Sequence, residues 1–209
     1  MLPHHAHPPG TTSQSMRNLQ YPLNWEEIFD HLGFPMFMKP HLGGGWRNVY
    51  KVHNPDELYA AYAQTGDLGM VLQESVEFTD YYRCYCIGRR HVHVMAYDPR
   101  YPHHERYRLD QDPTQSPLYE RIVRDSITLC QALGYDMNTV EFAVRDGIPY
   151  AIDYLNPAPD ADRNSVGEDN FEWILNAMAD LAIERALSDD PPQPDCHWAR
   201  FLAGDSPRS

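Results

Sequence analysis

The segment FPMFMKPHLGGGW, from Phe34 to Trp46, constrains the fold more than any other part of this sequence. An apolar run typical of a strand ends at Lys39 and Pro40, and three consecutive glycines follow. Glycine loses the most backbone entropy on folding, so a triplet occurs where the chain adopts unusual dihedral angles or where a ligand approaches the backbone closely. Because a second strand-like run follows at 46–52, we predict a β-hairpin whose glycine connection faces a ligand.

Length and charge limit the classes of function. The 209 residues suit one domain, or two small lobes that share a cleft. The formal net charge of −13 would repel a phosphate backbone, so nucleic acid is not an expected partner. The sequence has no apolar run of about 18 residues, and its amino end lacks the apolar core of a signal peptide. We therefore expect a cytoplasmic protein without a membrane partner.

The four cysteines are Cys84, Cys86, Cys130 and Cys196, and they include no CxxC pair. Cys84 and Cys86 lie two apart in a strand-like run, so their side chains point to one face. A disulfide between them is geometrically poor. The spacing predicts buried thiols.

Hydrophobic periodicity and chain breakers predict alternating helices and strands. Apolar residues at helical spacing predict helices at 25–32, 55–64, 118–133 and 167–187. Other apolar runs predict strands at 34–39, 46–52, 70–76, 81–87, 91–97, 138–144 and 150–155. The Asp146-Gly147 pair is the best turn signal in the chain and predicts that the last two strands form a hairpin.

The two ends of the chain differ from the rest in composition. Residues 1–20 are rich in Pro, His and small polar residues, and we expect an extended or disordered lead-in. Its histidines His4, His5 and His7 are metal-ligand types, but no second cluster has matching spacing, so a solvated tail is favoured. A loose tail rich in Pro and Asp is expected over 188–209.

Lys39 and the glycines do not form a Walker A loop. That loop needs GxxxxGK[ST] between a strand and a helix, whereas here the lysine precedes the glycines and a strand follows them. A lysine at a strand end beside a glycine hairpin can still hold a phosphate chain, through its charge and through backbone N–H groups.

Oxygen-bearing side chains recur on the last two predicted strands. Glu141 lies on one, and Asp153 and Asn156 lie on the other, so the three side chains can converge at one end of a sheet. Carboxylate and amide oxygens suit Mg²⁺ alongside phosphate oxygens. The alternative for Glu141 alone is a strand glutamate that faces solvent.

Taken in chain order, five segments together resemble the ATP-grasp family: FPMFMKPHLGGGW, VLQESVE, YYRCYCIG, TVEFAVRDG and IPYAIDYLNPAPD. The resemblance runs from about residue 34 to residue 160, and the combination is far more specific than any one segment. It implies an α+β fold in which two lobes with antiparallel sheets clamp ATP between them. The small lobe would span 21–76 and the large lobe 77–187.

The resemblance implies nucleotide binding by Lys39, Gly43, Gly44, Gly45, Gln73, Glu74, Val76, Glu77 and Asp80. Lys39 resembles the strand lysine that contacts the phosphates, and the glycines resemble the flexible loop that closes over them. Residues 73–76 resemble the hinge that reads adenine through backbone groups. The acidic residue that binds ribose usually lies two before the strand arginine, where this chain has Tyr81. Glu77 or Asp80 is expected to serve instead.

The resemblance also implies a role for Arg83 and a set of metal ligands. Arg83 falls at the strand arginine of the RimK-like members, where it would face substrate or phosphate. Glu141, Asp153 and Asn156 resemble the magnesium ligands. The family's usual ending is Glu-x-Asn, whereas this chain has one extra residue between Asp153 and Asn156, and a bulge in the strand would restore the convergence.

The implied activity is that of an ATP- and Mg²⁺-dependent ligase, which activates a carboxylate as an acyl phosphate for attack by an amine or a thiol. Lys39, Arg83 and Arg106 would be the catalytic residues, because the protein's share is mainly positioning and charge neutralisation. The long loop 98–117 would hold the anionic substrate through Arg100, His103, His104 and Arg106. A solvated loop is the alternative.

One departure from the family concerns the length of the chain. ATP-grasp enzymes generally carry an amino-terminal lobe before the clamp, and this sequence begins too late to contain one. We expect a shortened relative, a fragment, or a site that a second subunit or a second copy completes. A nucleotide-binding module without turnover is therefore the alternative function. A structural protein without a ligand would leave the glycine triplet and the three oxygen-bearing side chains unexplained.

Overall fold

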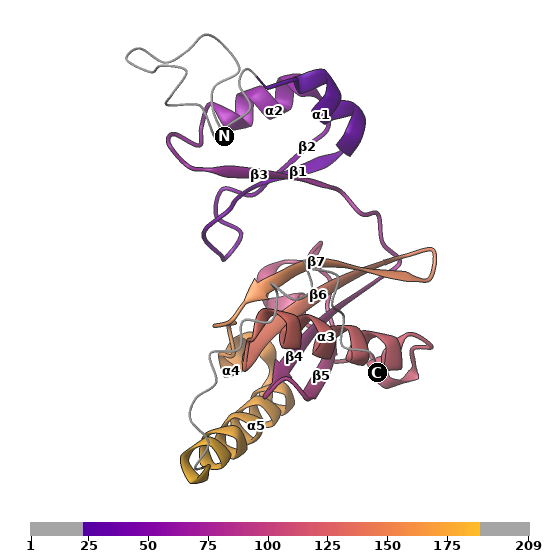
Figure 1. Ribbon diagram of the computed structural model, residues 1–209. Coiled ribbons are helices and arrows are strands. Elements are labelled where there is room, and N and C mark those ends of the chain that lie inside the picture. Colours follow the sequence, from indigo (N-terminus) through magenta and orange to yellow (C-terminus); the bar gives the residue numbers. More distant parts are fainter. Residues whose placement is uncertain (1–22, 189–209) are drawn as a thin grey trace. The chain divides into compact units, whose positions relative to one another are not determined.

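The computed structural model describes residues 23–188, and the chain divides between Ser75 and Val76 into two compact units. Figure 1 shows that each unit is a sheet with its own helices. The α+β class with antiparallel sheets is confirmed. The predicted lead-in over 1–20, with its three histidines, lies outside the described residues, as does the predicted tail from residue 189 onward.

The first unit is a three-stranded antiparallel sheet, of order β2-β1-β3, with two helices on one face. Its elements are α1 (Trp25–Leu32), β1 (Met36–Pro40), β2 (Tyr50–Val52), α2 (Pro55–Tyr62) and β3 (Met70–Glu74). Each helix begins after an asparagine whose side chain accepts a backbone N–H three residues on, at 3.3 Å for Asn24 and 2.9 Å for Asn54. Met36 and Met38 of β1 are fully buried against the helices.

The second unit is a four-stranded antiparallel sheet of order β5-β4-β6-β7 (Figure 1). Its strands are β4 (Asp80–Ile87), β5 (His91–Ala96), β6 (Met137–Arg145) and β7 (Ile148–Asn156). Its helices are α3 (Tyr119–Leu133), α4 (Arg163–Val166) and α5 (Glu168–Leu187), with 3-10 turns η1 (His103–Glu105) and η2 (Pro113–Gln115). None of these helices, nor any other in the described part of the chain, is long and apolar enough to cross a membrane.

Alternation along β4 sends its side chains into two different cores. Cys84 and Cys86 pack with α3 on one face of the sheet, whereas Tyr85 packs with Ile174 of α5 on the other. Cys84, Cys86 and Cys130 are buried free thiols, as predicted. Cys196 lies outside the described residues. The arrangement leaves one sheet face to α3 and the other to α5 and the candidate site.

Two sequence expectations differ from the structure. The strand predicted over 46–52 is formed only from Tyr50 to Val52, because Trp46 and Asn48 adopt positive φ angles of 61° and 57° and form a turn. The loop predicted over 98–117 contains the two 3-10 turns and a bridge between Tyr97 and Tyr107. By contrast, the predicted hairpin turn is confirmed, since Asp146 and Gly147 both have positive φ angles and join β6 to β7.

His93 of β5 lies half-buried beneath α5. Its ring stacks on Trp173 with centroids 4.8 Å apart, and its Nε2 lies 2.6 Å from Asn170 Oδ1. Asn170 uses its Nδ2 to donate to the carbonyl of Val166, so its Oδ1 is the acceptor and His93 carries a proton on Nε2. Burial lowers the pKa of His93, and the hydrogen bond to Asn170 opposes this effect only in part.

We expect this histidine to make stability depend on pH. Because its pKa is lower in the folded protein, the unfolded chain binds more protons in the window below the ordinary value of about 6.5. The free energy of unfolding should therefore be fully retained above about pH 6.5 and should fall as the pH drops below it. Urea denaturation at about pH 8 and about pH 5.5 should show a larger loss in the parent than in His93→Gln. Equal losses would contradict this assignment.

Candidate functional site

In the first unit, Lys39 lies on the sheet face opposite α1 and α2. Met36 and Met38 point into the core, so alternation along β1 puts Phe37 and Lys39 on the other face. Lys51 of β2 also lies there, with its Nζ 5.9 Å from the centre of the Phe37 ring. Both lysines of the chain are thus on one accessible sheet face, where they can meet an anion.

The glycine triplet forms an exposed connection between β1 and β2. Gly43 and Gly45 have φ angles of +134° and +64°, which residues with a side chain rarely adopt. A Cβ placed on any of the three glycines would meet no described atom within 4 Å beyond its chain neighbours. The backbone angles therefore explain the glycines at 43 and 45, and the approach of a phosphate to this loop stays a prediction.

The segment predicted to read adenine, Gln73–Val76, spans the end of β3 and the boundary between the two units. Gln73 lies opposite Phe37 of β1, and Ser75 is buried. Glu74 and Val76 lie on either side of Ser75. The adenine-reading role of this segment stays a prediction.

In the second unit, side chains from three strands meet around Glu141 of β6. Arg83 of β4 lies opposite Glu141, with its Nη1 3.3 Å from Glu141 Oε1. Tyr81, two residues earlier on β4, donates its hydroxyl to Glu141 Oε2 at 2.6 Å. Asp153 of β7 pairs with Glu141 from the other side. We call Tyr81, Arg83, Glu141 and Asp153 the sheet cluster.

Burial and charge determine the protonation of the sheet cluster. Burial is the largest single effect and by itself would lower the pKa of Arg83, but the electrostatic interactions with Glu141 and with nearby tyrosines together outweigh it and raise the pKa, so the guanidinium stays charged. Burial, and then the charge of Glu141, raise the pKa of Tyr81 well above its ordinary range, and the same two causes raise that of Tyr97. Both tyrosines therefore remain protonated beside a carboxylate.

Aromatic side chains surround the cluster and connect it to Arg106. The Tyr97 ring lies 5.7 Å from Arg83 Cζ and 5.1 Å from the ring of Tyr107. A hydrogen bond with Arg106 opposes the rise in the pKa of Tyr97 that burial causes, and Arg106 Nε donates to the carbonyl of Tyr101 at 3.0 Å. The structure thus brings both arginines predicted as catalytic to the same tyrosine.

A bulge in β7 places Asp153 and Asn156 on the same face as Glu141. Asp153 pairs with Glu141 and Asn156 pairs with Thr139, so β7 has one residue more than β6 between these pairs. Residues that lie opposite one another across two strands share a face, and Thr139 and Glu141 are two apart on β6. The extra residue seen in the sequence is therefore taken up by a bulge, as we expected.

The donor set fits a small divalent cation that prefers oxygen. Glu141 and Asp153 supply carboxylates and Asn156 supplies an amide oxygen, which are ligand types that Mg²⁺ accepts. Among residues 23–188, no group of three or more His, Cys, Asp and Glu side chains is arranged to hold a metal ion. The predicted set has two carboxylates, and Arg83 already balances the charge of one. Magnesium binding stays a prediction.

Two of the loop residues predicted to hold substrate already pair with acidic neighbours in the same loop. Arg100 forms a two-point ion pair with Asp98, with its Nη2 2.7 Å from Asp98 Oδ2 and its Nε 2.9 Å from Oδ1. This hydrogen bonding lowers the pKa of Asp98. His104 pairs with the adjacent Glu105 at 3.2 Å, and both are exposed. His103 is the first residue of η1. The charge of Arg100 is thus already balanced by a neighbour.

A cavity of about 200 Å³ lies between the start of β4 and this loop. Its lining includes Asp80, predicted to bind ribose, Arg100, predicted to bind substrate, and Tyr81 and Tyr97 from around the cluster. The guanidinium of Arg100 lies 4.5 Å from the centre of the Phe78 ring on the cavity wall. The cavity is smaller than the usual pocket for a drug-sized ligand.

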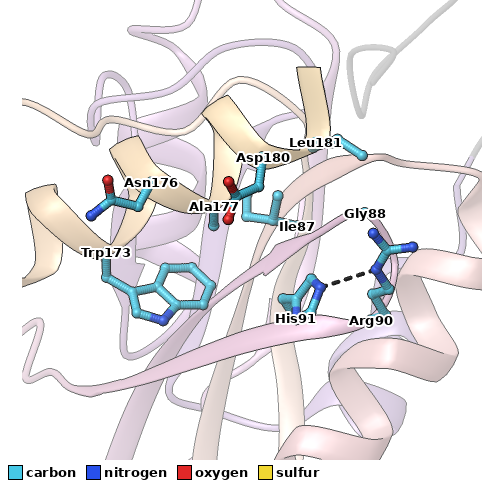
Figure 2. Close-up of a pocket in the computed structure, with 9 residues that line it drawn as sticks. All are labelled: Ile87, Gly88, Arg90, His91, Trp173, Asn176, Ala177, Asp180 and Leu181. Carbon is cyan, nitrogen blue, oxygen red and sulfur yellow. Dashed lines mark hydrogen bonds between the residues drawn. The ribbon is translucent and has the colours of Figure 1, made fainter. Parts of the chain in front are cut away.

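A second cavity, of about 260 Å³, lies between α5 and the β4–β5 hairpin. Figure 2 shows Trp173 and Asp180 on the helix and His91 and Arg90 on the hairpin, with Arg90 Nε donating to His91 Nε2 at 3.0 Å. None of its lining residues was predicted as a site residue. The chemistry expected from the sequence therefore lies elsewhere on this unit.

Sequence reasoning missed the aromatic residues Tyr97 and Tyr107. Tyr97 ends a predicted strand, and alternation along that strand could have placed it on the face of Met95. Tyr107 lies in the loop and is placed beside Tyr97 by an isolated bridge and a ring contact, and such contacts leave no periodic signal in the sequence.

Comparison with known proteins agrees with the resemblance drawn from the sequence. The fold is that of the ATP-grasp enzymes. The D-alanine–D-alanine ligase of Bacillus anthracis, solved in complex with ATP, matches with a TM-score of 0.59 and 23% identity, over 78% of this chain and 54% of that one. The N5-carboxyaminoimidazole ribonucleotide synthetase of Thermus thermophilus matches with a TM-score of 0.53 and 18% identity, over 75% of this chain and 44% of that one.

Sequence comparison leads to the same group of proteins. The D-alanine–D-alanine ligase A of Bacillus cereus is 25% identical in an alignment 180 residues long, which covers 79% of this chain and 58% of the ligase. No protein-family model matches the chain. The chain thus spans a little over half the length of the ligases it resembles.

Proposed function

We propose that this chain is an ATP- and Mg²⁺-dependent ligase-like enzyme, which activates a carboxylate as an acyl phosphate for attack by an amine or a thiol. The observation that carries the proposal is the sheet cluster, in which Glu141 faces Asp153 on one side and Arg83 on the other. Carboxylates for a metal beside a buried cation are what phosphoryl transfer requires. The shared ATP-grasp fold supports the same chemistry by analogy.

In this proposal the nucleotide is bound by the residues that the sequence predicts for it. Lys39 balances phosphate charge, and the glycine loop offers backbone N–H groups to the phosphates. Segment 73–76 reads adenine, and Glu77 or Asp80 binds ribose. Glu141, Asp153 and Asn156 hold Mg²⁺, which would supply charge neutralisation at the phosphate oxygens.

The arginines act on the anions that react. Arg83 is held in place by Glu141 and by the ring of Tyr97, and it remains charged in a largely buried setting. Glu141 would share its carboxylate between Arg83 and the metal, so the guanidinium of Arg83 would be available to an anionic substrate or to the transferred phosphoryl group. Arg106, which hydrogen-bonds with Tyr97, would contribute a second positive charge near the same anion. Arg100, His103 and His104 are the proposed contacts to the carboxylate substrate.

The proposed ligands and partner proteins rest on the roles given to these residues and on the charge of the chain. We propose ATP and a small carboxylate as ligands, and a second subunit or second copy as a contributor to the acceptor site. The net charge of −13 argues against a nucleic-acid partner. The three described cysteines are free thiols, which fits the reducing cytosol.

A nucleotide-binding module without turnover is the second candidate. The chain matches 54% of the ligase structure that holds ATP, so the whole ligase's activity stays a proposal for this chain. In this case the nucleotide contacts proposed above are kept, and no substrate is consumed.

A calorimetric titration with a non-hydrolysable ATP analogue, with and without Mg²⁺, tests the proposal. We expect binding that requires the metal, followed by ADP release from ATP when small carboxylates and amines are screened. Metal-dependent binding without ADP release would select the module. Absence of binding in both conditions would overturn both candidates.

The metal assignment predicts that Asp153→Asn makes nucleotide binding less dependent on Mg²⁺, because a neutral amide is a weaker ligand for a hard cation than a carboxylate. The matched control is Asp146→Asn, which makes the same change at the other end of the β6–β7 hairpin, in a turn that asparagine tolerates. Titrations in which Asp153→Asn keeps the metal dependence of the parent would remove Asp153 from the site.

A further inference from the structure

We propose that Asn138 is a positioning residue, whose buried carboxamide holds the β7 bulge between Asp153 and Asn156 and thereby sets where Asn156 lies relative to Asp153. Asn138 is the second residue of β6 and is fully buried. Its side chain lies on the α3 face, where Nδ2 is 3.5 Å from Cys130 Sγ, and so on the sheet face opposite Glu141. The inference rests on the proposed function only in that Asp153 and Asn156 are taken as metal ligands.

Asn138 makes two hydrogen bonds to the backbone of β7. Its Nδ2 donates to the carbonyl of Tyr154 at 2.9 Å, and its Oδ1 accepts the backbone N–H of Asn156 at 3.0 Å. These two backbone groups flank Leu155, inside the segment where the register shifts. The carboxamide therefore connects β6 to the bulge on both sides of one residue.

A bulge needs such a partner. Tyr154 and Leu155 of β7 together occupy the place opposite Val140 of β6, so some of their backbone groups lose their ladder partners. Unpaired backbone groups away from water are costly, and nearly all of them find a donor or an acceptor. A carboxamide offers one of each, as a peptide group does. Asn138 thus stands in for the missing ladder bonds.

The bulge decides on which face Asn156 lies. In a regular strand, residues three apart such as Asp153 and Asn156 point to opposite faces. With the bulge, both pair with site-facing residues of β6, namely Glu141 and Thr139. Asn138 therefore acts on the proposed ligands through the β7 backbone and from the far side of the sheet, without itself reaching a metal or a substrate.

Amide hydrogen exchange tests the hydrogen bonds without any ligand. In the parent, the Asn156 amide should exchange slowly, as the amide of Phe142 in the middle of β6 does. In Asn138→Leu, which keeps the size and removes both bonds, Asn156 exchange should be about tenfold faster relative to Phe142. In Asn138→Asp, which keeps the acceptor, it should stay near the parental ratio. Ile122→Ala loosens the same core from α3 and serves as the control.

Two results would overturn the inference. One is fast exchange of the Asn156 amide in the parent, which decides the question even where the leucine variant fails to fold. The other is a ratio of the Asn156 to the Phe142 amide exchange rate that changes no more in Asn138→Leu than in Ile122→Ala.

Nucleotide titration then links the bulge to the metal. In Asn138→Leu, the gain in affinity for the ATP analogue that Mg²⁺ provides should fall about tenfold, while the affinity measured without metal should not change. In Ile122→Ala, neither affinity should change. Unchanged metal dependence in Asn138→Leu would show that Asn138 does not position the ligands. Should the parent itself show no metal-dependent binding, the proposed function fails, and the exchange ratios still decide whether Asn138 holds the bulge.

Discussion

Replacing Glu141 with glutamine is expected to lower the free energy of unfolding by about 3 kcal/mol. The side chains of Arg83 and Glu141 are only 12% and 15% exposed, so Arg83 would remain largely buried without an opposite charge. Its Nε already has no hydrogen-bond partner among the described residues. Glutamine keeps the size of the side chain and an acceptor for Tyr81, so the loss reports the missing charge. Urea denaturation measures it.

Two further variants make this result specific. Asp125→Asn removes the acid of two partly exposed ion pairs on α3, with Arg121 at 3.4 Å and with Arg124 at 3.3 Å, and should cost less than about 1 kcal/mol. Combining Glu141→Gln with Arg83→Met removes both charges, and the loss should be smaller than the sum of the two single losses. If Glu141→Gln lowers the free energy of unfolding no more than Asp125→Asn does, the stabilising role of the buried ion pair is contradicted.

Lys39→Met is expected to weaken binding of the ATP analogue by roughly 30-fold, or about 2 kcal/mol, which is typical of a lost hydrogen bond to a charged group. Lys39 is partly exposed and opposite the core of its unit, so the stability should change by no more than about 0.5 kcal/mol. Calorimetry with Mg²⁺ present measures the affinity, and denaturation measures the stability.

The second lysine of the chain provides the matched control. Lys51 lies on the same sheet face, where its Nζ is over the Phe37 ring, and Lys51→Met removes the same charge. A direct phosphate contact by Lys39 predicts a much smaller loss of affinity in Lys51→Met. Equal losses would mean that the face attracts the nucleotide only through its general positive charge, and that Lys39 makes no specific contact.

The elements predicted from the sequence were those with a local physical cause. Asn24 and Asn54 begin α1 and α2 because their side chains accept backbone N–H groups three residues away. The Asp146-Gly147 turn forms because both positions need positive φ angles, which these residue types tolerate. The strand predicted to begin at Trp46 was too long, since a local pattern of apolar residues does not show that the chain turns through positive φ angles before Tyr50.

The candidate site was predicted less completely. Arg83 and Glu141 were singled out separately, and their ion pair follows from the pairing of β4 with β6, which are joined through β5, a long loop and α3. Arg100 was expected to meet an anionic substrate; that role stays a prediction, and the structure adds an ion pair with Asp98, only two residues away, that the sequence analysis did not foresee. The cluster of tyrosines around Arg83 depends on loop 98–117 folding back on β5, which residue spacing does not reveal.

The sequence by itself determined the helices, most strand positions and the hairpin turn, because caps, turns and periodicity act over a few residues, and it supplied the residues of the candidate site as a prediction. Only the tertiary structure decided the register of β7 against β6, and with it the face on which Asn156 lies. That register depends on the carboxamide of Asn138, which reaches another strand from the opposite side of the sheet. A bond between residues far apart in the chain has no local pattern, so it becomes visible only once the strands are paired.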